Sequence, residues 1–529
     1  MTKLKGRRTL FTAMALILAL SLQACSGGNN GGSAEPSASS GAAGTNSTSS
    51  TGSPEPAGGA EALKPYEVSI IYFGAPQRDD ALVEAKLSEY FKEKFNATVD
   101  LQPIASSEYK QKTELMLNAG EPMDLVFTAS WLNFFGNVAK GAFLDLDDLL
   151  AKYGQGITEN LNPIYLEAPR YKGKLYGIPT NKEITQGKAY TYRKDIIDKY
   201  NIPIEDIKTM SDFEPWFKLL KEKEPGLILD FIKESGEGMM YETRSNFRAI
   251  GPTPNKIPLF LYDYTNTDNI QIKSVIDPEI SSIAQAEYEL NRSYYEKGYI
   301  NSDAATTTTE IGDLRKQGKI WMQQAVWKPG ADIELKIASD NKYDFVSKVI
   351  EEPIVTTDLA AGSMFSISRT SKDPERAMMV LNALHTDPYA VNLFVNGIEG
   401  THYKKISENR IEPIADSGYG SSALFWVVGN QLINYLKPGQ PDDLYTSWKK
   451  FNDEAKRSPL LGFVFDESPV KNEITQLTSV IGEYRAASTG AIPDPAKMLA
   501  ERNEKLKKAG IEKVKTELQT QIDAWKAAQ

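Results

Sequence analysis

Residues 68–129 alternate between strand and helix patterns, and this alternation limits the possible fold more than any other feature of the sequence. The predicted elements are a strand at 68–72, a helix at 79–95, a strand at 99–104, a helix at 107–118 and a strand at 124–129. Because strand–helix–strand units form parallel sheets with right-handed crossovers, this order predicts an α/β fold. Ligands bind beyond the carboxyl ends of such strands, where Ser130 and Trp131 follow.

Helix signals continue after this first sheet. Ser211 and Glu214 have the spacing of a capping box. Asp373 and Ser468 each precede a proline, an arrangement typical of the first turn of a helix. The C-terminal part of the chain predicts a helical hairpin that turns at Ala509 and Gly510.

The length from residue 66 to the C-terminus is too great for one compact core and predicts two lobes. Short strand signals occur at 175–178 and 319–325, and they recur at 355–357 and 364–368 after a long helical middle. The chain is therefore expected to cross between the two lobes more than once.

The N-terminus has the three parts of a bacterial secretory signal. Four basic residues lie within the first eight positions, and an apolar run at 10–20 follows that is too short to span a bilayer in the mature protein. The sequence Leu22-Gln23-Ala24-Cys25 then looks like a lipobox. We predict a signal peptide at 1–24 and lipidation of Cys25; the alternative is an ordinary signal peptide with a chance cysteine.

Residues 25–65 predict a tether rather than a folded segment. They consist almost entirely of small, polar, proline and glutamate residues, which cannot bury enough apolar surface to fold. Two acyl chains on Cys25 would anchor the protein stably, where one chain is marginal. The expected location is the extracellular face of the cell membrane, with the folded part held near the surface by a lipid anchor.

Cysteine content and charge exclude several classes of function. Cys25 is the only cysteine, so no disulfide can form within the chain and no cysteine-based zinc site or cysteine nucleophile is available. The net charge is −10, and the predicted signal carries four Lys/Arg and no Asp/Glu, so the mature chain is more acidic still. An acidic chain without a basic cluster is a poor candidate for binding nucleic acid.

Motifs of common enzyme classes are missing from the sequence. It has no G-x-S-x-G, H-E-x-x-H, P-loop or G-x-G-x-x-G motif, no calcium loop, and only two histidines, His385 and His402. No metal site or other cofactor is expected. A glycosidase that uses two carboxylates stays open, because 70 Asp and Glu residues could supply such a pair. A receptor for peptides or another polar solute also stays open.

Four stretches of the chain, in their order and spacing, resemble one family. They are 120–128 with 141–146, 173–179 with 192–195, 396–403, and 462–473. Together they resemble family-1 extracellular solute-binding proteins of ABC importers, specifically the LipO-like lipoproteins. The likeness runs through almost all of residues 66–529.

This resemblance implies a two-lobed fold like that of periplasmic binding proteins, with a hinged interlobe cleft and a helical C-terminus. It places the N-terminal lobe at 66–179 plus 359–412 and the C-terminal lobe at 180–358 plus 413–529. It implies a monomer without catalytic activity that captures a carbohydrate, in this group generally an oligosaccharide. Lobe closure would trap the sugar, which the permease subunits of an ABC importer would then receive.

A sugar site needs flat aromatic rings for the C–H faces of the sugar and polar side chains for its hydroxyl rim. Trp131 is the first candidate because it follows a buried strand. Trp327 ends a predicted strand of the second lobe and could face Trp131; for Trp321, on the same strand and the same side, the alternative is a place in the core. The ten candidate ligand-binding residues are Trp131, Asn181, Lys182, Glu183, Trp327, Glu399, His402, Tyr403, Trp426 and Asn430.

The other candidates follow from their positions. Residues 181–183 come directly after an expected crossing between lobes, residues 399–403 form a polar cluster in a glycine-rich loop, and Trp426 and Asn430 lie one helical turn apart near another crossing. Each group has a structural alternative: a solvated loop, a structural turn, or core packing.

Overall fold

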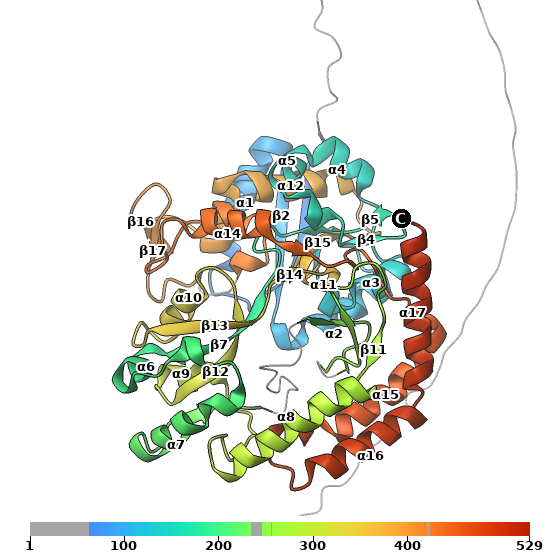
Figure 1. Ribbon diagram of the computed structural model, residues 1–529. Helices are drawn as coiled ribbons and strands as arrows, with labels where there is room; N and C mark the ends of the chain where they lie inside the picture. Colours follow the sequence, from blue (N-terminus) through green and yellow to red (C-terminus); the bar gives the residue numbers. More distant parts are fainter. Residues whose placement is uncertain (1–62, 234–245, 255–256, 421–423) are drawn as a thin grey trace, which may run out of the picture. The chain divides into compact units, whose positions relative to one another are not determined.

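The N-terminal pattern forms the expected sheet. The computed structural model describes residues 63–233, 246–254, 257–420 and 424–529; the predicted signal peptide, Cys25 and nearly all of the tether lie outside these residues. Strand β1 (Tyr66–Phe73) pairs in parallel with β2 (Ala97–Ile104) and with β3 (Leu125–Thr128). Helices α1 (Asp80–Phe95) and α2 (Ser106–Ala119) connect these strands (Figure 1). The α/β prediction is therefore confirmed.

Two distant segments complete this first sheet. Strand β15 (Met364–Ile367) pairs antiparallel with β3, and β6 (Ile178–Pro179) pairs antiparallel with β15. The strand order is β2-β1-β3-β15-β6, so the parallel core is extended by the antiparallel strand β15 and then by β6, which runs in the same direction as the core strands. The short strand predicted at 364–368 thus belongs to the N-terminal sheet.

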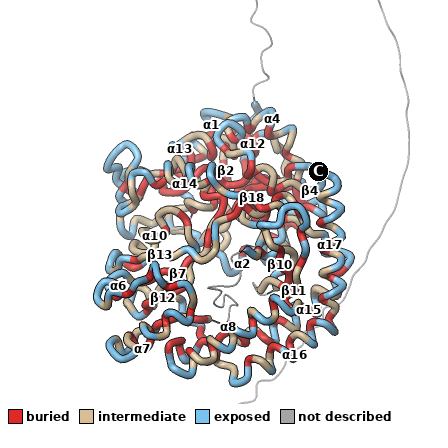
Figure 2. Tube along the Cα trace, in the orientation of Figure 1, coloured by how far each residue is buried: buried red, intermediate tan, exposed pale blue. Residues whose placement is uncertain are grey.

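Helices cover this sheet and bury its apolar side chains. In α1, Val83, Leu87 and Phe91 are fully buried, as their helical spacing requires. Helices α12 (Pro374–Thr386) and α13 (Pro388–Asn396) pack in the same core, and Asp373 caps α12 as predicted by accepting a hydrogen bond from the backbone N–H of Arg376. Buried segments concentrate along this sheet in Figure 2.

A second sheet has its own core. Its order is β13-β7-β12-β8, formed by β13 (Phe345–Glu351), β7 (Gly187–Arg193), β12 (Ile320–Trp327) and β8 (Ile228–Asp230). Trp321 lies in the centre of this core with only 1% of its surface exposed, and its ring contacts Tyr192, Phe213 and Phe217 at centroid distances of 5.7–5.9 Å. Trp321 is thus a core residue, one of the two roles considered for it.

A third unit is mainly helical. Helices α8 (Pro278–Glu296), α15 (Lys471–Glu483), α16 (Pro495–Lys508) and α17 (Ile511–Ala527) lie together in Figure 1. Helices α15, α16 and α17 share a core with the antiparallel strands β9 (Phe247–Ile250), β10 (Phe260–Asp263) and β11 (Lys273–Ser274), whereas α8 contacts α16 and buries Tyr294 in the core of the second sheet. The predicted C-terminal hairpin is present, and Gly510 turns it with a φ of +91°, a conformation that favours glycine.

Several shorter elements complete the described structure. They are α3 (Phe134–Ala139), α4 (Asp147–Tyr153), α5 (Gln155–Asn160), α6 (Lys194–Tyr200), α7 (Glu214–Lys223), α9 (Ile311–Lys316), α10 (Ala331–Ala338), α11 (Thr357–Ala360) and α14 (Leu444–Glu454), with the strand pairs β4 (Arg170–Tyr171) and β5 (Lys174–Leu175), β14 (Ile354–Val355) and β18 (Lys456–Arg457), and β16 (Tyr403–Lys405) and β17 (Ile411–Pro413). No helix within the described ranges is long and apolar enough to span a bilayer.

Two predicted helix starts differ from the structure. The capping box before α7 is formed by Thr209 and Asp212, whose side chains each accept a hydrogen bond from the other's backbone N–H, rather than by Ser211 and Glu214. Ser468 begins a short 3₁₀ helix, and α15 starts after Val470 without a side-chain cap. The lobe boundaries given above stay a prediction.

The packing of Trp321 leads to a test of the second core. Trp321→Ala should lower the free energy of unfolding by about 3–5 kcal/mol, because it removes a large buried ring. Urea denaturation followed by circular dichroism measures this change. Val326→Ala on the same strand is the matched control: its side chain is 52% exposed, so its effect should stay within about 0.5 kcal/mol. Equal effects of the two substitutions would contradict the assigned core.

Candidate functional site

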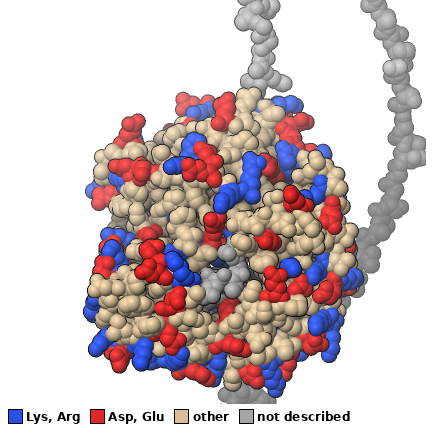
Figure 3. Space-filling view, in the orientation of Figure 1, with Lys and Arg blue, Asp and Glu red and all other residues tan. Residues whose placement is uncertain are grey.

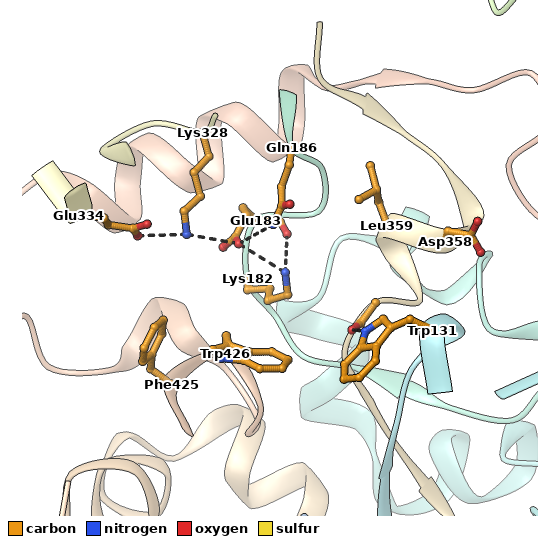
Figure 4. Close-up of a pocket in the computed structure, with 11 residues that line it drawn as sticks. Trp131, Lys182, Glu183, Gln186, Lys328, Glu334, Asp358, Leu359, Phe425 and Trp426 are labelled. Atoms are coloured by element: carbon orange, nitrogen blue, oxygen red, sulfur yellow. Dashed lines mark hydrogen bonds and ion pairs between the residues drawn. The ribbon is translucent and has the colours of Figure 1, made fainter. Parts of the chain in front are cut away.

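A cavity of about 380 Å³ lies where segments from the first and second sheets meet. Trp131 reaches it from the end of β3, Lys182 and Glu183 from the segment after β6, and Lys328 from the segment after β12. The cavity is lined by Trp131, Lys182, Glu183, Gln186, Lys328, Glu334, Asp358, Leu359, Gly362, Phe425 and Trp426 (Figure 4). Trp131, Lys182 and Lys328 each follow the carboxyl end of a strand, as the α/β pattern predicts for ligand-contacting residues.

One side of the cavity is aromatic. Trp131 is 49% exposed, and its indole N–H donates a hydrogen bond to the carbonyl oxygen of Gly362 at 2.8 Å. Phe73 backs both tryptophans, with ring centroids 5.6 Å from Trp131 and 5.6 Å from Trp426. Phe127 also contacts both rings, at 6.4 and 5.9 Å. The two tryptophans are therefore held in place from behind, and Trp131 presents ring surface to solvent.

The opposite side carries a network of charges (Figure 4). The Oε1 atom of Glu183 lies 3.4 Å from the ammonium group of Lys182 and 3.3 Å from that of Lys328. The same Lys328 group lies 3.0 Å from Glu334 and over the ring of Trp448 at 4.6 Å. Glu183 is only 5% exposed, so this is a buried network rather than a surface pair.

Backbone contacts fix the segment that carries Glu183. Asn452 of α14 donates a hydrogen bond to the carbonyl oxygen of Lys182 at 2.7 Å and accepts one from the N–H of Ile184 at 2.9 Å. The hydroxyl of Tyr165 donates to the same carbonyl of Lys182. These bonds lie on either side of Glu183 and hold its carboxylate at the cavity wall.

The network sets the charge state of Glu183. Burial acts to raise its pKa, but the ammonium groups of Lys182 and Lys328 more than offset this and lower the pKa to about 2. Burial likewise acts to lower the pKa of Lys328, and the carboxylates of Glu183 and Glu334 raise it above its usual value. Both groups are thus charged over the whole physiological pH range.

The Oε2 atom of Glu183 is buried and has no hydrogen-bond partner within the part of the chain that the structure describes. A buried carboxylate oxygen without a donor is costly, so such an atom is suited to accept a hydrogen bond from a ligand or an ordered water. The described residues include no group of three or more His, Cys, Asp or Glu side chains placed to hold a metal ion.

Four of the sequence candidates line the cavity: Trp131, Lys182, Glu183 and Trp426. Asn181 directly precedes the lining residue Lys182 in the chain and pairs with Asn430 through an isolated parallel β-bridge. Their side chains are used elsewhere: the Asn181 amide donates to the carbonyl of Asn160 at 3.1 Å, and the Asn430 amide donates to that of His385 at 3.0 Å.

The other four candidates are not among the lining residues. Trp327 contacts Phe451 at 6.0 Å and does not face Trp131 across the cavity. His402 is buried: its Nδ1 accepts from the N–H of Ile398 at 2.8 Å, and its Nε2 lies 3.3 Å from Asp79.

Tyr403 packs on Tyr435, and Glu399 is exposed. The cluster at 399–403 therefore has contacts that explain it structurally, and ligand contact by these residues stays a prediction.

Sequence reasoning missed seven lining residues. They are Gln186, Lys328, Glu334, Asp358, Leu359, Gly362 and Phe425. Lys328 carried a usable signal, because it directly follows the carboxyl end of a predicted strand. For Asp358 to Gly362 the sequence offered no comparable signal, since these residues reach the cavity through the connection between β14 and β15.

Comparison with known proteins identifies the class of this fold and site. A family model described as a bacterial extracellular solute-binding protein matches residues 74–390, more than half of the chain. The chain therefore belongs to the bacterial extracellular solute-binding proteins, which confirms the resemblance to that family; the assignment to its LipO-like lipoproteins stays a prediction. A second model, a domain of unknown function (DUF3502), matches residues 459–527, which include α15, α16 and α17.

Individual relatives agree with this assignment. A carbohydrate ABC transporter substrate-binding protein of Streptococcus pneumoniae serotype 4 is 30% identical over 465 residues, covering 87% of this chain and 90% of the relative. The crystal structure of the N-glycan transport solute binding protein (NgtS) of S. pneumoniae is 27% identical, with a TM-score of 0.75 over 87% of this chain and 99% of that one. An HMO-binding solute-binding protein of Bifidobacterium longum infantis, at 15% identity and a TM-score of 0.59, shares the fold.

The charge network leads to a test of pH dependence. The pKa of Glu183 falls from 4.5 to about 2 on folding, so its stabilisation of about 3 kcal/mol is complete above pH 4.5 and is lost as the pH falls towards 2. Glu183→Gln should therefore lower the Tm at neutral pH, and the deficit should shrink between about pH 5 and pH 3.

Glu89→Gln is the matched control, because this side chain is 71% exposed on α1 and pairs only with Lys86 in the described structure. It should change the Tm little at any pH. A deficit of Glu183→Gln that stays constant from neutral to acidic pH would contradict the assigned network.

Proposed function

We propose that this protein captures a carbohydrate, specifically an oligosaccharide, for a bacterial ABC importer. The observation that carries this proposal is the cavity with tryptophan rings on one side and charged and amide groups on the other. A pyranose ring has the matching surfaces, because its C–H groups form flat apolar faces and its hydroxyls project around the rim. The structures of NgtS in complex with Man1GlcNAc and Man5GlcNAc support the same class of ligand.

The proposed mechanism is capture by closure of two lobes. Residues that line the cavity come from both large sheets and from the segments that connect them, so one sugar can contact all of these elements at once. The sugar favours the closed form by its greater affinity for that form. The loaded monomer then docks on the permease subunits, which receive the sugar.

The alternative of a glycosidase fits the cavity less well. Glycosidases place two carboxyl groups on either side of the scissile bond. Here the ammonium group of Lys328 lies between Glu183 and Glu334, at 3.3 and 3.0 Å from their oxygens, and occupies the space that a glycosidic oxygen would need. We therefore propose binding without turnover.

We also propose that the protein is anchored to the extracellular face of the membrane through lipid on Cys25. The lipobox-like sequence at 22–25 and the low-complexity segment that follows it support this proposal. Anchoring would keep the receptor at high local concentration near its permease.

Thermal melting of residues 63–529 against a panel of glycans tests the proposed ligand class. The panel includes Man5GlcNAc, maltotriose and kestose, with short peptides as controls. A concentration-dependent rise in Tm with a glycan, without release of new reducing ends, is expected. A response to peptides alone, or cleavage of the added glycan, would refute the proposal.

Substitution of Trp131 tests the position of the sugar. Trp131→Ala should weaken binding of the glycan by about tenfold or more, because it removes ring surface that contacts the sugar. Isothermal titration calorimetry measures the Kd. Tyr389→Ala is the matched control, since Tyr389 is similarly exposed (52%) but lies outside the cavity. If both variants bind the glycan with wild-type affinity, the sugar does not stack on Trp131.

Substitution of Cys25 tests the anchor. In the full-length chain, Cys25→Ala should move the protein from the membrane fraction to the medium and abolish incorporation of labelled palmitate. The wild-type chain, labelled in parallel, is the control. Unchanged membrane association of the variant would argue against lipidation at this position.

A further inference from the structure

The cationic groups in the cavity are already engaged by the protein. The ammonium group of Lys182 contacts the carbonyl and the carboxylate of Glu183 at 3.3 and 3.4 Å. The ammonium group of Lys328 contacts Glu183 and Glu334 and lies over the ring of Trp448. The indole N–H of Trp131 is likewise used by the carbonyl of Gly362. The strongest hydrogen-bond donors of the cavity, the two ammonium groups and the indole N–H, therefore already contact acceptors of the protein.

Negatively charged acceptor groups outnumber positively charged donor groups in the lining of the cavity. Three carboxylates, those of Glu183, Glu334 and Asp358, line it together with two lysines, so the lining has a formal net charge of −1. Glu183 is only 5% exposed, and its Oε2 atom is buried without a hydrogen-bond donor among the described residues. Figure 4 shows the carboxylate of Asp358 pointing away from the two lysines.

We propose that this site selects uncharged glycans and discriminates against sugars that carry a carboxylate or another anionic group. The inference rests on the proposed function and specifies its ligand class. Glu183 is the residue that determines the selectivity: its Oε2 atom accepts a hydrogen bond from a sugar hydroxyl.

The physical reason is the difference between a hydroxyl and a carboxylate. A hydroxyl can turn its hydrogen towards Glu183, whereas a carboxylate at neutral pH offers only acceptors. An anionic sugar would therefore place a further negative charge beside the carboxylates of Glu183, Glu334 and Asp358, where like charges repel. The ammonium groups of Lys182 and Lys328 already neutralise Glu183 and Glu334, so they offset this repulsion only in part.

A pair of glycans that differ in one group tests the inference. The probes are Man5GlcNAc and Man5GlcNAc whose terminal C6 hydroxyls have been oxidised to carboxylates, with Kd values measured by calorimetry at pH 7. The wild-type protein should bind the neutral form at least about tenfold more tightly. Equal affinity, or tighter binding of the oxidised form, would overturn the inference but leave the proposed function standing. Binding of neither form would overturn both for this glycan class.

Two variants separate charge selectivity from a structural role. Glu183→Gln should weaken binding of the neutral glycan and also reduce the ratio of the two Kd values, because the two lysines lose a shared counter-charge. Asp358→Asn changes an exposed side chain on the cavity wall, leaves the buried network intact, and should reduce the ratio as well. Glu89→Gln, outside the cavity, should leave the ratio unchanged. A ratio that stays at the wild-type value in both cavity variants would refute the role of these carboxylates.

Discussion

The ion pairs of Glu183 with Lys182 and Lys328 are the contacts on which the geometry of the cavity depends. They join the segment after β6 of the first sheet to the segment after β12 of the second sheet. A buried carboxylate between two ammonium groups is strongly favoured in its charged form, whereas removal of one partner would leave a charge without compensation. The network thus adds to the pairing of β7 with β12, which already places Gly187 opposite Trp327, and fixes the side chains at the binding site. On the face shown in Figure 3, Lys and Arg side chains are interspersed with Asp and Glu side chains and form no large patch of one charge.

The aromatic side of the cavity depends on the first sheet. Phe73 ends β1 and Phe127 lies in β3, and both rings stand behind Trp131 and Trp426. Because β1 and β3 are adjacent and parallel, their carboxyl ends meet at one edge, which brings these rings together. The two sides of the cavity are thus positioned differently. The geometry of the first sheet positions the rings of Trp131 and Trp426, whereas contacts between segments distant in sequence position the charged groups of Glu183 and Lys328.

This difference explains what the sequence could predict. The first three strands and two helices follow from local periodicity, and Trp131 follows from its place after β3. Strands β7 and β13 were not predicted, because they form by pairing with distant strands: β7 with β12 and β13, and β13 with β7 across more than 150 positions of sequence. The misplaced capping box has a local cause: Thr209 with Asp212 and Ser211 with Glu214 both fit the pattern, and only the fold selects between them.

The site residues show the same division. Trp327 was chosen for its ring, but successive residues of an extended chain point to opposite sides, and it is Lys328 that reaches the cavity. His402 was chosen for its residue type and its glycine-rich loop, whereas the structure uses it to bind the loop to Asp79 at the start of α1. Residue chemistry together with position along the chain identified four of the eleven lining residues; the others required knowledge of which distant segments converge.

The hydrogen bond from the indole of Trp131 to the carbonyl of Gly362 has a thermodynamic consequence. Together with the contacts to Phe73 and Phe127, this bond supports the ring in its observed orientation, although 49% of its surface is exposed. A freely rotating aromatic side chain would lose conformational entropy when a ligand covers it, and that loss would weaken binding. Here the Trp131 side chain is ordered when the protein folds. A ligand that covers it therefore loses little binding free energy to side-chain ordering, even if the contact area is small.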